Sequence, residues 1–385
     1  RMRSIVPRQQ AGCDERRAQD EGSLPCTCPK PSESAGIVVA EWLPGARLTA
    51  GYPAGTPIGR VHVLRRRRST TAVYAAVMAS AGLLVAACAS SPTATSDGAT
   101  APGSGSESGQ TIAPEPPPEL PRGGREVFPE YRLVGYSGVM GDVNEDMGRL
   151  TGDLDARCEQ IERVGKRYEY GRRLLPVFEF IPVVVHGSPQ KDGTYRTRVG
   201  KGQVREYLEA ARRCKALLLL NIQPGRSEFM PEMKHYEKFL EEPDVGVALD
   251  PEWAMDPGEI PGVNLGRTDG PELNEAAMYL SDIVAEHNLP EKVMVFHQFN
   301  FGAVEKIKGL KPQPGVALIR SIDGLGGPEA KIEEYNALIK NQPPYIHPGF
   351  KLFYKEDTSP PWGSRLMTPK EVMALRPRPE YILYE

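Results

Sequence analysis

The sequence predicts an α/β fold, a (β/α)8 barrel of the TIM type, and three observations support it. From residue 126 onward, eight short apolar runs rich in β-branched residues alternate with longer segments of helical pattern. Alternation of strands and helices is typical of a parallel sheet. The length agrees too, because eight strand–helix units over about 255 residues match the size of such barrels. A doubly wound open sheet is the alternative.

The expected strands occupy 132–137, 174–186, 216–222, 245–253, 293–299, 316–322, 350–355 and 381–384, and the expected helices lie near 145–164, 202–214, 228–241, 271–287, 327–340 and 368–375. The uninterrupted apolar run 216–220 is typical of a strand buried on both faces. Thr368, Pro369 and Glu371 form a good helix start, with a capping residue, a proline in the first turn and a glutamate three residues on. The helical pattern is weakest at 302–314.

The segment 1–87 differs from the barrel. Residues 1–60 have no sustained hydrophobic period, and we interpret them as a disordered leader or as sequence outside the native reading frame. Residues 61–87 are typical of a secretory signal, because four arginines at 65–68 precede an uncharged apolar core at 71–87. That core is short for a membrane-spanning helix of about 20 residues, which is the alternative interpretation.

The end of this core, Leu84-Val-Ala-Ala-Cys88, resembles the bacterial lipobox. The resemblance implies that the thiol of Cys88 receives a diacylglycerol, that the chain is cut just before it, and that fatty acyl chains of the palmitate type anchor the protein to the outer face of the cytoplasmic membrane. The paired arginines are similar to twin-arginine signals, although residues 69–71 lack the apolar side chains expected there. The rest of the chain resembles actinobacterial lipoproteins of uncharacterised activity.

Residues 88–125 predict a disordered tether. They are rich in Ser, Thr, Gly, Ala and Pro, and such a stretch buries too little apolar surface to offset the entropy of ordering its backbone. The barrel domain at 126–385 would then be held away from the membrane.

Charge and motifs exclude several classes of function. Segment 88–385 has 35 basic and 44 acidic residues, a balance that repels phosphate backbones, so we expect no nucleic-acid partner. No P-loop, Gly-x-Gly-x-x-Gly or Gly-x-Ser-x-Gly motif follows a predicted strand, so we expect neither a cofactor nor a serine nucleophile. No dedicated metal-ligand spacing is present either, and we expect no metal.

Cys158 and Cys214 predict a disulfide. They are the thiols left beyond Cys88, export would expose them to an oxidising compartment, and they lie on consecutive helices of the outer ring. The bond needs Cα atoms within about 7 Å; otherwise two separate buried thiols are expected.

Catalytic residues of such barrels lie at the carboxyl ends of the strands. The polar residues there are Tyr136, Ser137, Glu179, His186, Asn221, Gln223, Asp250, Glu252, His297, Gln298, Asp323, Lys351, Tyr354 and Glu385. Burying a polar group without a hydrogen-bond partner costs free energy, so we expect these side chains either to pair with one another or to bind a substrate.

Asp250 and Glu252 are the strongest candidates. On a strand extending through 253 they would point to the same side. Neighbouring carboxylates repel each other's ionisation, which raises at least one pKa and leaves a proton donor near neutral pH. The alternative is that Asp250 caps the following loop and that Glu252 pairs with Arg226 or Arg320.

Leu249-Asp250-Pro251-Glu252 resembles the Asp-x-Glu of family 25 lysozymes and family 18 chitinases. The resemblance implies that Glu252 is the general acid and that Asp250 assists the transition state. It covers about eight residues; the longer family 18 signature is absent, and the first strand lacks the family 25 aspartate.

We therefore expect a surface-anchored, glycan-active barrel, a glycoside hydrolase acting on peptidoglycan or another polysaccharide. The other hypothesis is a catalytically inert barrel that binds a glycan or an envelope partner. The residues expected to bind substrate are Glu179, Asn221, Gln223, Trp253, His297, Gln298 and Tyr354.

Overall fold

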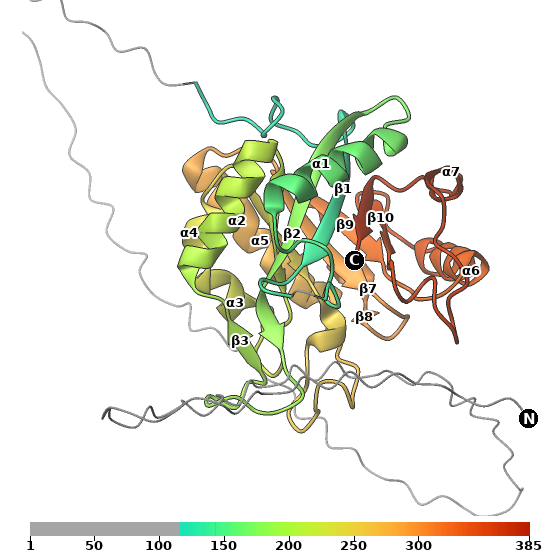
Figure 1. Cartoon of the computed structure of the whole chain (residues 1–385). Coiled ribbons are helices and arrows are strands. Elements are labelled where there is room, and N and C mark those ends of the chain that lie inside the picture. The colour runs from blue at the N-terminus through green and yellow to red at the C-terminus, as the bar shows by residue number, and fades with distance from the viewer. Residues whose placement is uncertain (1–115, 143) are drawn as a thin grey trace, which may run out of the picture.

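The computed structural model describes residues 116–142 and 144–385, which form a closed barrel of eight parallel strands surrounded by helices (Figure 1). The strands are β1 (Tyr131–Gly138), β2 (Arg173–Val185), β4 (Leu217–Ile222), β5 (Val245–Leu249), β7 (Lys292–Gln298), β9 (Val316–Ile322), β10 (His347–Leu352) and β11 (Tyr381–Tyr384). Each pairs with its neighbours in this order, and the pairing of β1 with β11 closes the ring. The predicted barrel is therefore present, and the open-sheet alternative is wrong.

The helices are α1 (Leu154–Gly165), α2 (Lys201–Cys214), α3 (Phe229–His235), α4 (Glu237–Leu240), α5 (Gly270–His287), α6 (Pro328–Ile339) and α7 (Pro369–Val372). The capping box expected at Thr368 and Glu371 is present in α7. The predicted helix at 228–241 is divided into α3 and α4. The segment 302–314 contains no α-helix; it holds the two-residue strand β8 (Val304–Glu305) and a 3₁₀ turn, η3 (Ile307–Gly309).

Two short strand pairings lie outside the barrel, at the carboxyl ends of its strands. Strand β3 (Arg196–Arg198) pairs antiparallel with the long end of β2. Strand β6 (Thr268–Asp269) pairs with β8, which ties the loop after β5 to the loop after β7.

The barrel interior is apolar toward the amino ends of the strands. Side chains alternate along each strand, and the inward positions form one cluster that includes Leu133, Leu175, Val177, Leu217, Leu219, Ala248, Val293, Val295, Ala317, Ile319 and Leu383. The outward positions join the helices in a second, larger cluster. Both faces of the strands are therefore buried and apolar, as expected of a parallel barrel.

The amino end of the barrel is covered by the segment that precedes β1. Leu120 and Val127 are buried against the interior cluster, and Arg125 donates to the carbonyl groups of Pro118 and Leu289. The prediction that the tether extends to residue 125 is wrong for its last ten residues, because this segment has one apolar side chain and two arginines that make specific contacts with the barrel.

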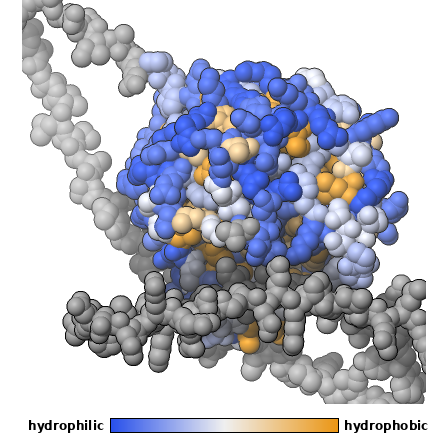
Figure 2. Space-filling model, in the orientation of Figure 1, coloured by the Kyte–Doolittle hydropathy of each residue, from blue (hydrophilic) through white to orange (hydrophobic). Residues whose placement is uncertain are grey.

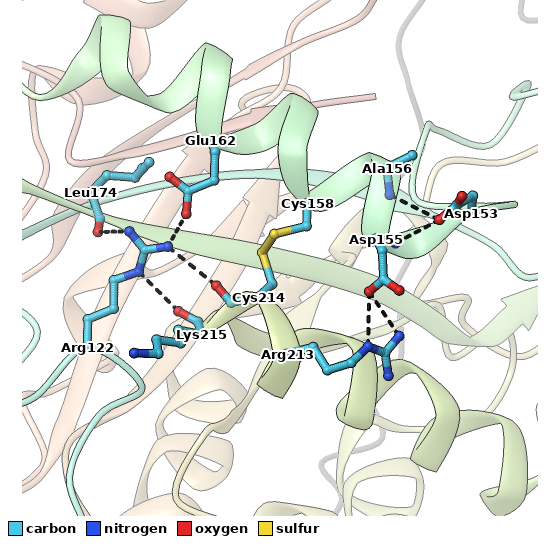
Figure 3. The surroundings of a disulfide bond; sticks show 10 residues. All are labelled: Arg122, Asp153, Asp155, Ala156, Cys158, Glu162, Leu174, Arg213, Cys214 and Lys215. Carbon is cyan, nitrogen blue, oxygen red and sulfur yellow. Dashed lines mark hydrogen bonds and ion pairs between the residues drawn. A yellow bond between two sulfur atoms is a disulfide. The ribbon is translucent and has the colours of Figure 1, made fainter.

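A disulfide joins Cys158 of α1 to Cys214 of α2, with 5.8 Å between the Cα atoms (Figure 3). The pairing and the distance agree with the prediction. The guanidinium of Arg122 lies beside it and donates to the carbonyl oxygens of Leu174 in β2 and of Lys215 at the end of α2, which connects the covering segment to both elements (Figure 3).

Replacing Cys158 with alanine should lower the free energy of unfolding by about 2–4 kcal/mol, because the cross-link restricts the unfolded chain. The two cysteines are 56 residues apart, so the disulfide closes a long loop, and a longer loop means a larger entropy loss in the unfolded chain. Urea unfolding of the oxidised protein measures the effect, and Cys214→Ala should give the same loss. An unchanged midpoint in both variants would show that the bond contributes nothing to stability.

The predicted signal, the lipidation site Cys88 and most of the tether lie outside the described residues. Within the described part of the chain, no helix is both long and apolar enough to cross a membrane. The face of the barrel in Figure 2 is mainly hydrophilic, with hydrophobic residues in small patches.

Candidate active site

Eight polar side chains form one layer above the apolar interior, each from a different barrel strand or the residue just after it. We call this layer the polar ring; its members are Ser137, Glu179, Asn221, Asp250, His297, Asp323, Lys351 and Glu385. Most of them continue the inward alternation of the apolar positions below, as in the series Leu217, Leu219 and Asn221. All except Glu385 are buried.

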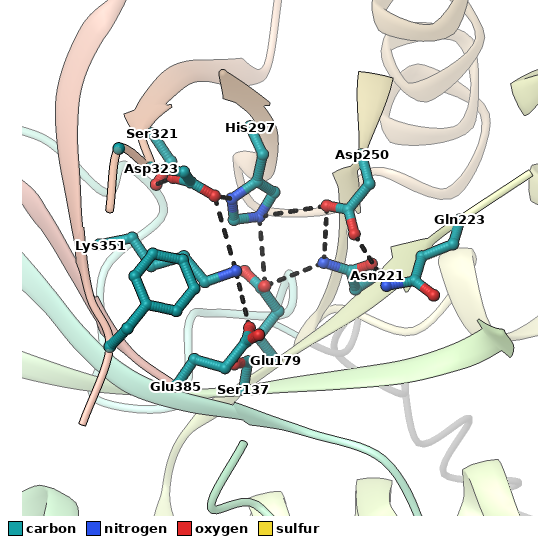
Figure 4. A network of polar contacts seen from close by, with 12 residues as sticks. Ser137, Glu179, Asn221, Gln223, Asp250, His297, Ser321, Asp323, Lys351 and Glu385 are labelled. Atoms are coloured by element: carbon teal, nitrogen blue, oxygen red, sulfur yellow. Dashed lines mark hydrogen bonds and ion pairs between the residues drawn. The ribbon is translucent and has the colours of Figure 1, made fainter. Parts of the chain in front are cut away.

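On one side of the ring, two amides hold two carboxylates. The Nδ2 atom of Asn221 donates to Glu179 Oε1 at 3.0 Å and to Asp250 Oδ1 at 3.1 Å (Figure 4). The Nε2 atom of Gln223 donates to Asp250 Oδ2 at 3.2 Å, and Tyr381 donates its hydroxyl hydrogen to Glu179. Both carboxylates are therefore fixed in orientation.

On the other side, His297 and Lys351 supply the positive charges. The Nδ1 atom of His297 lies 2.6 Å from Asp323 Oδ2, and its Nε2 atom lies 3.2 Å from Glu179 Oε1. The Nζ atom of Lys351 lies 2.7 Å from Glu385 Oε2 and 3.5 Å from Asp323 Oδ2 (Figure 4).

These contacts decide the protonation of the ring. Burial by itself would raise the pKa of Glu179 and of Asp323, but His297 and Lys351 hold both pKa values below their ordinary range. Burial would lower the pKa of His297, yet the carboxylates of Asp323, Glu179 and Asp250 raise it well above its ordinary value. The imidazole is therefore a cation at neutral pH.

Glu252 is not on the strand that the sequence predicts. Strand β5 ends at Leu249, and Pro251–Trp253 form the 3₁₀ turn η2. Proline has no backbone N–H to donate to a sheet, so Pro251 ends the strand at this point. The expectation that strand alternation places Asp250 and Glu252 on one side is therefore wrong, although the two carboxyls remain electrostatic neighbours.

Glu252 is half-buried, and its Oε2 atom is buried with no hydrogen-bond partner. Burial, together with the nearby charges of Asp250 and Asp323, raises the pKa of Glu252 to about 8. Burial also raises the pKa of Asp250, to about 6. At pH 7 Glu252 thus has a proton to donate while Asp250 is ionised.

The alternatives considered for these two carboxyls do not apply. The side chain of Asp250 caps no backbone group of η2. Arg226 donates to the carbonyl of Glu259, and Arg320 donates to Gln298 Oε1 and to the carbonyl of Leu338. Neither arginine is an ion-pair partner of Glu252.

Among the residues predicted to bind substrate, the ring brings together Glu179, Asn221 and His297, and Gln223 contacts it through Asp250. Gln298 does not belong to it: the residue after the inward-facing His297 points outward and contacts Arg320 and the carbonyl of Asn300. Tyr354 follows β10, stacks on Tyr384 and lies under the guanidinium of Arg149. Trp253 is half-buried at the end of η2.

Sequence reasoning noted Ser137, Asp323, Lys351 and Glu385 as polar strand ends but assigned them no role, and it missed Tyr381. The alternation of inward positions could have found the first four. Tyr381 starts its strand, so a search restricted to carboxyl ends passes over it.

The ring is closed above rather than open. Lys351 joins Asp323 to Glu385, and Ser137 donates to Glu385 Oε2 at 2.8 Å. Two cavities among the described residues, of about 510 and 460 Å³, lie away from the ring, one beside Met140 and Tyr207 and the other beside Gly123 and Tyr131. No group of three or more His, Cys, Asp or Glu side chains among residues 116–142 and 144–385 has the geometry to hold a metal ion.

Comparison with known proteins adds one structural neighbour. No protein-family model and no curated protein matches the chain. The crystal structure of a GH18 chitinase from Pseudoalteromonas aurantia is similar to it with a TM-score of 0.32 and 10% sequence identity, over 66% of this chain and 93% of that chain. A likeness this weak carries no argument about the site, and the barrel is established by its own strand pairing.

Proposed function

We propose that this barrel is a glycoside hydrolase in which Glu252 is the general acid and Asp250 its charged partner. The observation that carries the proposal is the placement of Glu252 on the turn just after the fourth barrel strand, where its Oε2 atom is buried with no hydrogen-bond partner. This burial raises the pKa of Glu252 to about 8. A carboxylic acid that keeps its proton near neutral pH can donate it to the oxygen of a glycosidic bond.

Asp250 has the complementary property. Its pKa of about 6 leaves it ionised at pH 7, and Asn221 and Gln223 fix its two oxygens. A carboxylate in that position stabilises the positive charge that develops on the sugar ring as the bond breaks. The two carboxyls, two residues apart, thus have the two different pKa values that this chemistry requires.

The other members of the ring would support this pair without taking part in the reaction. Glu179 and His297 adjoin Asp250 and Asn221, and Tyr381 fixes Glu179. Such contacts hold reacting groups in place before the substrate arrives.

A glycan-binding protein without catalysis is the second candidate, and the closure of the ring by Lys351 favours it. The two are separated by incubating the full chain with peptidoglycan and with chitin oligosaccharides at pH 7 and measuring released reducing ends. Release above the background of a heat-inactivated sample supports the hydrolase. Binding to either glycan without any release would support the binding protein instead.

We further propose that the protein is exported and anchored by a lipid on Cys88 to the outer face of the cytoplasmic membrane. The support is the order of four arginines, an uncharged apolar core and small residues before the cysteine. Mass spectrometry of protein extracted from membranes should find a diacylated N-terminal cysteine at position 88, and Cys88→Ala should abolish the modification. Mature protein that retains residues 61–87 would contradict this proposal.

A further inference from the structure

Basic side chains gather at the amino end of the barrel, although the domain as a whole is acidic. Residues 116–385 contain 35 basic and 41 acidic residues. Two short connections depart from this balance, 166–173 before β2 and 376–380 before β11. We call their basic residues the basic cluster; its members are Lys166, Arg167, Arg172, Arg173, Arg376 and Arg378.

The two connections lie side by side on the surface. The buried guanidinium of Arg132, in β1, donates to two carbonyls of the first connection and to the carbonyl of Pro379 in the second. Arg378 of the second connection lies over the ring of Tyr170 in the first, 5.4 Å from its centroid. The basic cluster is therefore one patch rather than two.

Most of the positive charge in this patch is not neutralised by the protein. Arg172 pairs with Glu380 and Arg173 pairs with Glu130, and Glu169 is a further exposed carboxylate nearby. Three carboxylates thus face six cations. Among the described residues, no ion-pair partner belongs to the other four cations, which are Lys166, Arg167, Arg376 and Arg378. A partner for this patch must bring negative charge.

The rest of the amino end does not share this excess. The connection 241–244, which precedes β5, is acidic, and Arg212 of α2 pairs with both Glu242 and Asp244. The uncompensated charge is therefore local to the side where β11, β1 and β2 begin.

The predicted tether reaches the barrel beside the basic cluster. The covering segment lies at the amino end, and Arg173 of the cluster donates to the carbonyl of Arg122 within that segment at 2.9 Å. The chain enters the barrel at the end opposite to β3 (Figure 1). From Cys88 to residue 116 there are 28 positions, and a flexible chain of that length spans roughly 30 Å. An anchor at Cys88 thus keeps the patch within reach of the membrane surface.

We infer that the basic cluster docks on anionic lipid headgroups, so that the barrel stands with its amino end on the membrane and Glu252, at the carboxyl end, faces away from it. This rests on the lipid anchor proposed for Cys88. Lysine and arginine side chains bind lipid phosphates and are attracted by an anionic membrane surface. Tyr170, 49% exposed in the first connection, suits the same boundary, because its ring is apolar and its hydroxyl is polar.

Sedimentation with vesicles tests this inference on the chain from residue 88 with Cys88→Ala, which has neither an acyl group nor the predicted signal. The barrel within it is closed by its own strand pairing and filled by its own core. Vesicles of phosphatidylcholine with about 30% phosphatidylglycerol should bind it about tenfold more tightly than pure phosphatidylcholine vesicles. This preference should fall severalfold as salt rises from about 0.05 to 0.5 M, since salt screens the attraction.

Replacing the four unpaired cations of the cluster with glutamine should remove the preference. The matched control replaces four exposed lysines on elements that follow the carboxyl ends of strands, and it should keep the preference; these are Lys191, Lys201, Lys234 and Lys308. Arg376 and Arg378 also donate to backbone carbonyls. The double variant Lys166→Gln/Arg167→Gln removes no such bond and should still lose severalfold, even if the fourfold variant is unstable.

Equal binding to the two kinds of vesicle, or equal losses in the cluster and control variants, would overturn the docking. Tighter binding of soluble polyglycerol phosphate than of vesicles, at equal phosphate concentration, would also overturn it in favour of an envelope polymer. The vesicle result does not depend on acylation, because the tested chain has none. Failure of the Cys88 anchor is seen separately, by mass spectrometry of the mature protein.

Discussion

Replacing Glu252 with glutamine should lower kcat on the glycan substrate by about 10²–10⁴-fold, the range expected when general acid catalysis is lost. Glutamine has nearly the same shape, but its amide cannot donate a proton to a leaving oxygen. Steady-state release of reducing ends at pH 7 measures the effect.

The thermal midpoint of this variant should stay close to that of the wild type. Glutamine is neutral, as Glu252 is at pH 7 given its pKa of about 8, so the substitution adds no buried charge. Glu275→Gln, at an exposed position of α5, is the matched control and should leave both activity and midpoint unchanged. A Glu252→Gln enzyme with half or more of the wild-type kcat would exclude this residue as the acid.

Replacing Lys351 with methionine should lower the free energy of unfolding by about 3–5 kcal/mol, because removing one partner of a buried ion pair leaves the other charge uncompensated. The side chain of Lys351 is 7% exposed, and its loss would leave Glu385 without a cation and Asp323 with His297 as its remaining one. Denaturant unfolding at pH 7 measures the change.

The control for this prediction is Lys355→Met. Lys355 lies near Lys351 in the chain and pairs with Asp146 at 2.9 Å, but its side chain is 70% exposed. An exposed pair contributes about 0–1 kcal/mol, so this variant should be nearly as stable as the wild type. Equal losses in the two variants would contradict the assignment of Lys351 to a buried network.

Much of the barrel follows from the sequence, and the exceptions have physical reasons. Run length and alternation of elements predict the eight strands. All eight ring members are among the polar residues noted at strand ends, and five residues that the ring contains or that contact it directly were assigned a role: Glu179, Asn221, Gln223, Asp250 and His297. Gln298 was expected to bind substrate, but its side chain points outward. The sequence does not reveal this, because the outward-facing Met294 and Phe296 are as apolar as the inward-facing Val293 and Val295. When both faces of a strand are buried, composition cannot tell which face points inward.

Glu252 shows a second kind of exception. Its role is predicted from a short Asp-x-Glu pattern read as part of a strand, yet Pro251 ends that strand and places the glutamate on a turn. The raised pKa therefore comes from burial and from the charges of Asp250 and Asp323, of which the last lies 71 positions further along the chain. Only the closed barrel brings these three carboxyls together.

The central claim is that Glu252 is a protonated carboxylic acid at neutral pH, and ¹³C NMR of the glutamate side-chain carboxyl carbons between pH 4 and 10 tests it without any substrate. The pKa of Glu252 is about 8 in the folded protein against an ordinary value of 4.5, so the native protein holds this proton more tightly than the unfolded chain does. The free energy of unfolding should therefore decrease as the pH rises from 4.5 to about 8. We expect one carboxyl resonance with a midpoint near 8, absent from Glu252→Gln and present in Glu275→Gln. A resonance of Glu252 that titrates near 4.5 would contradict the account.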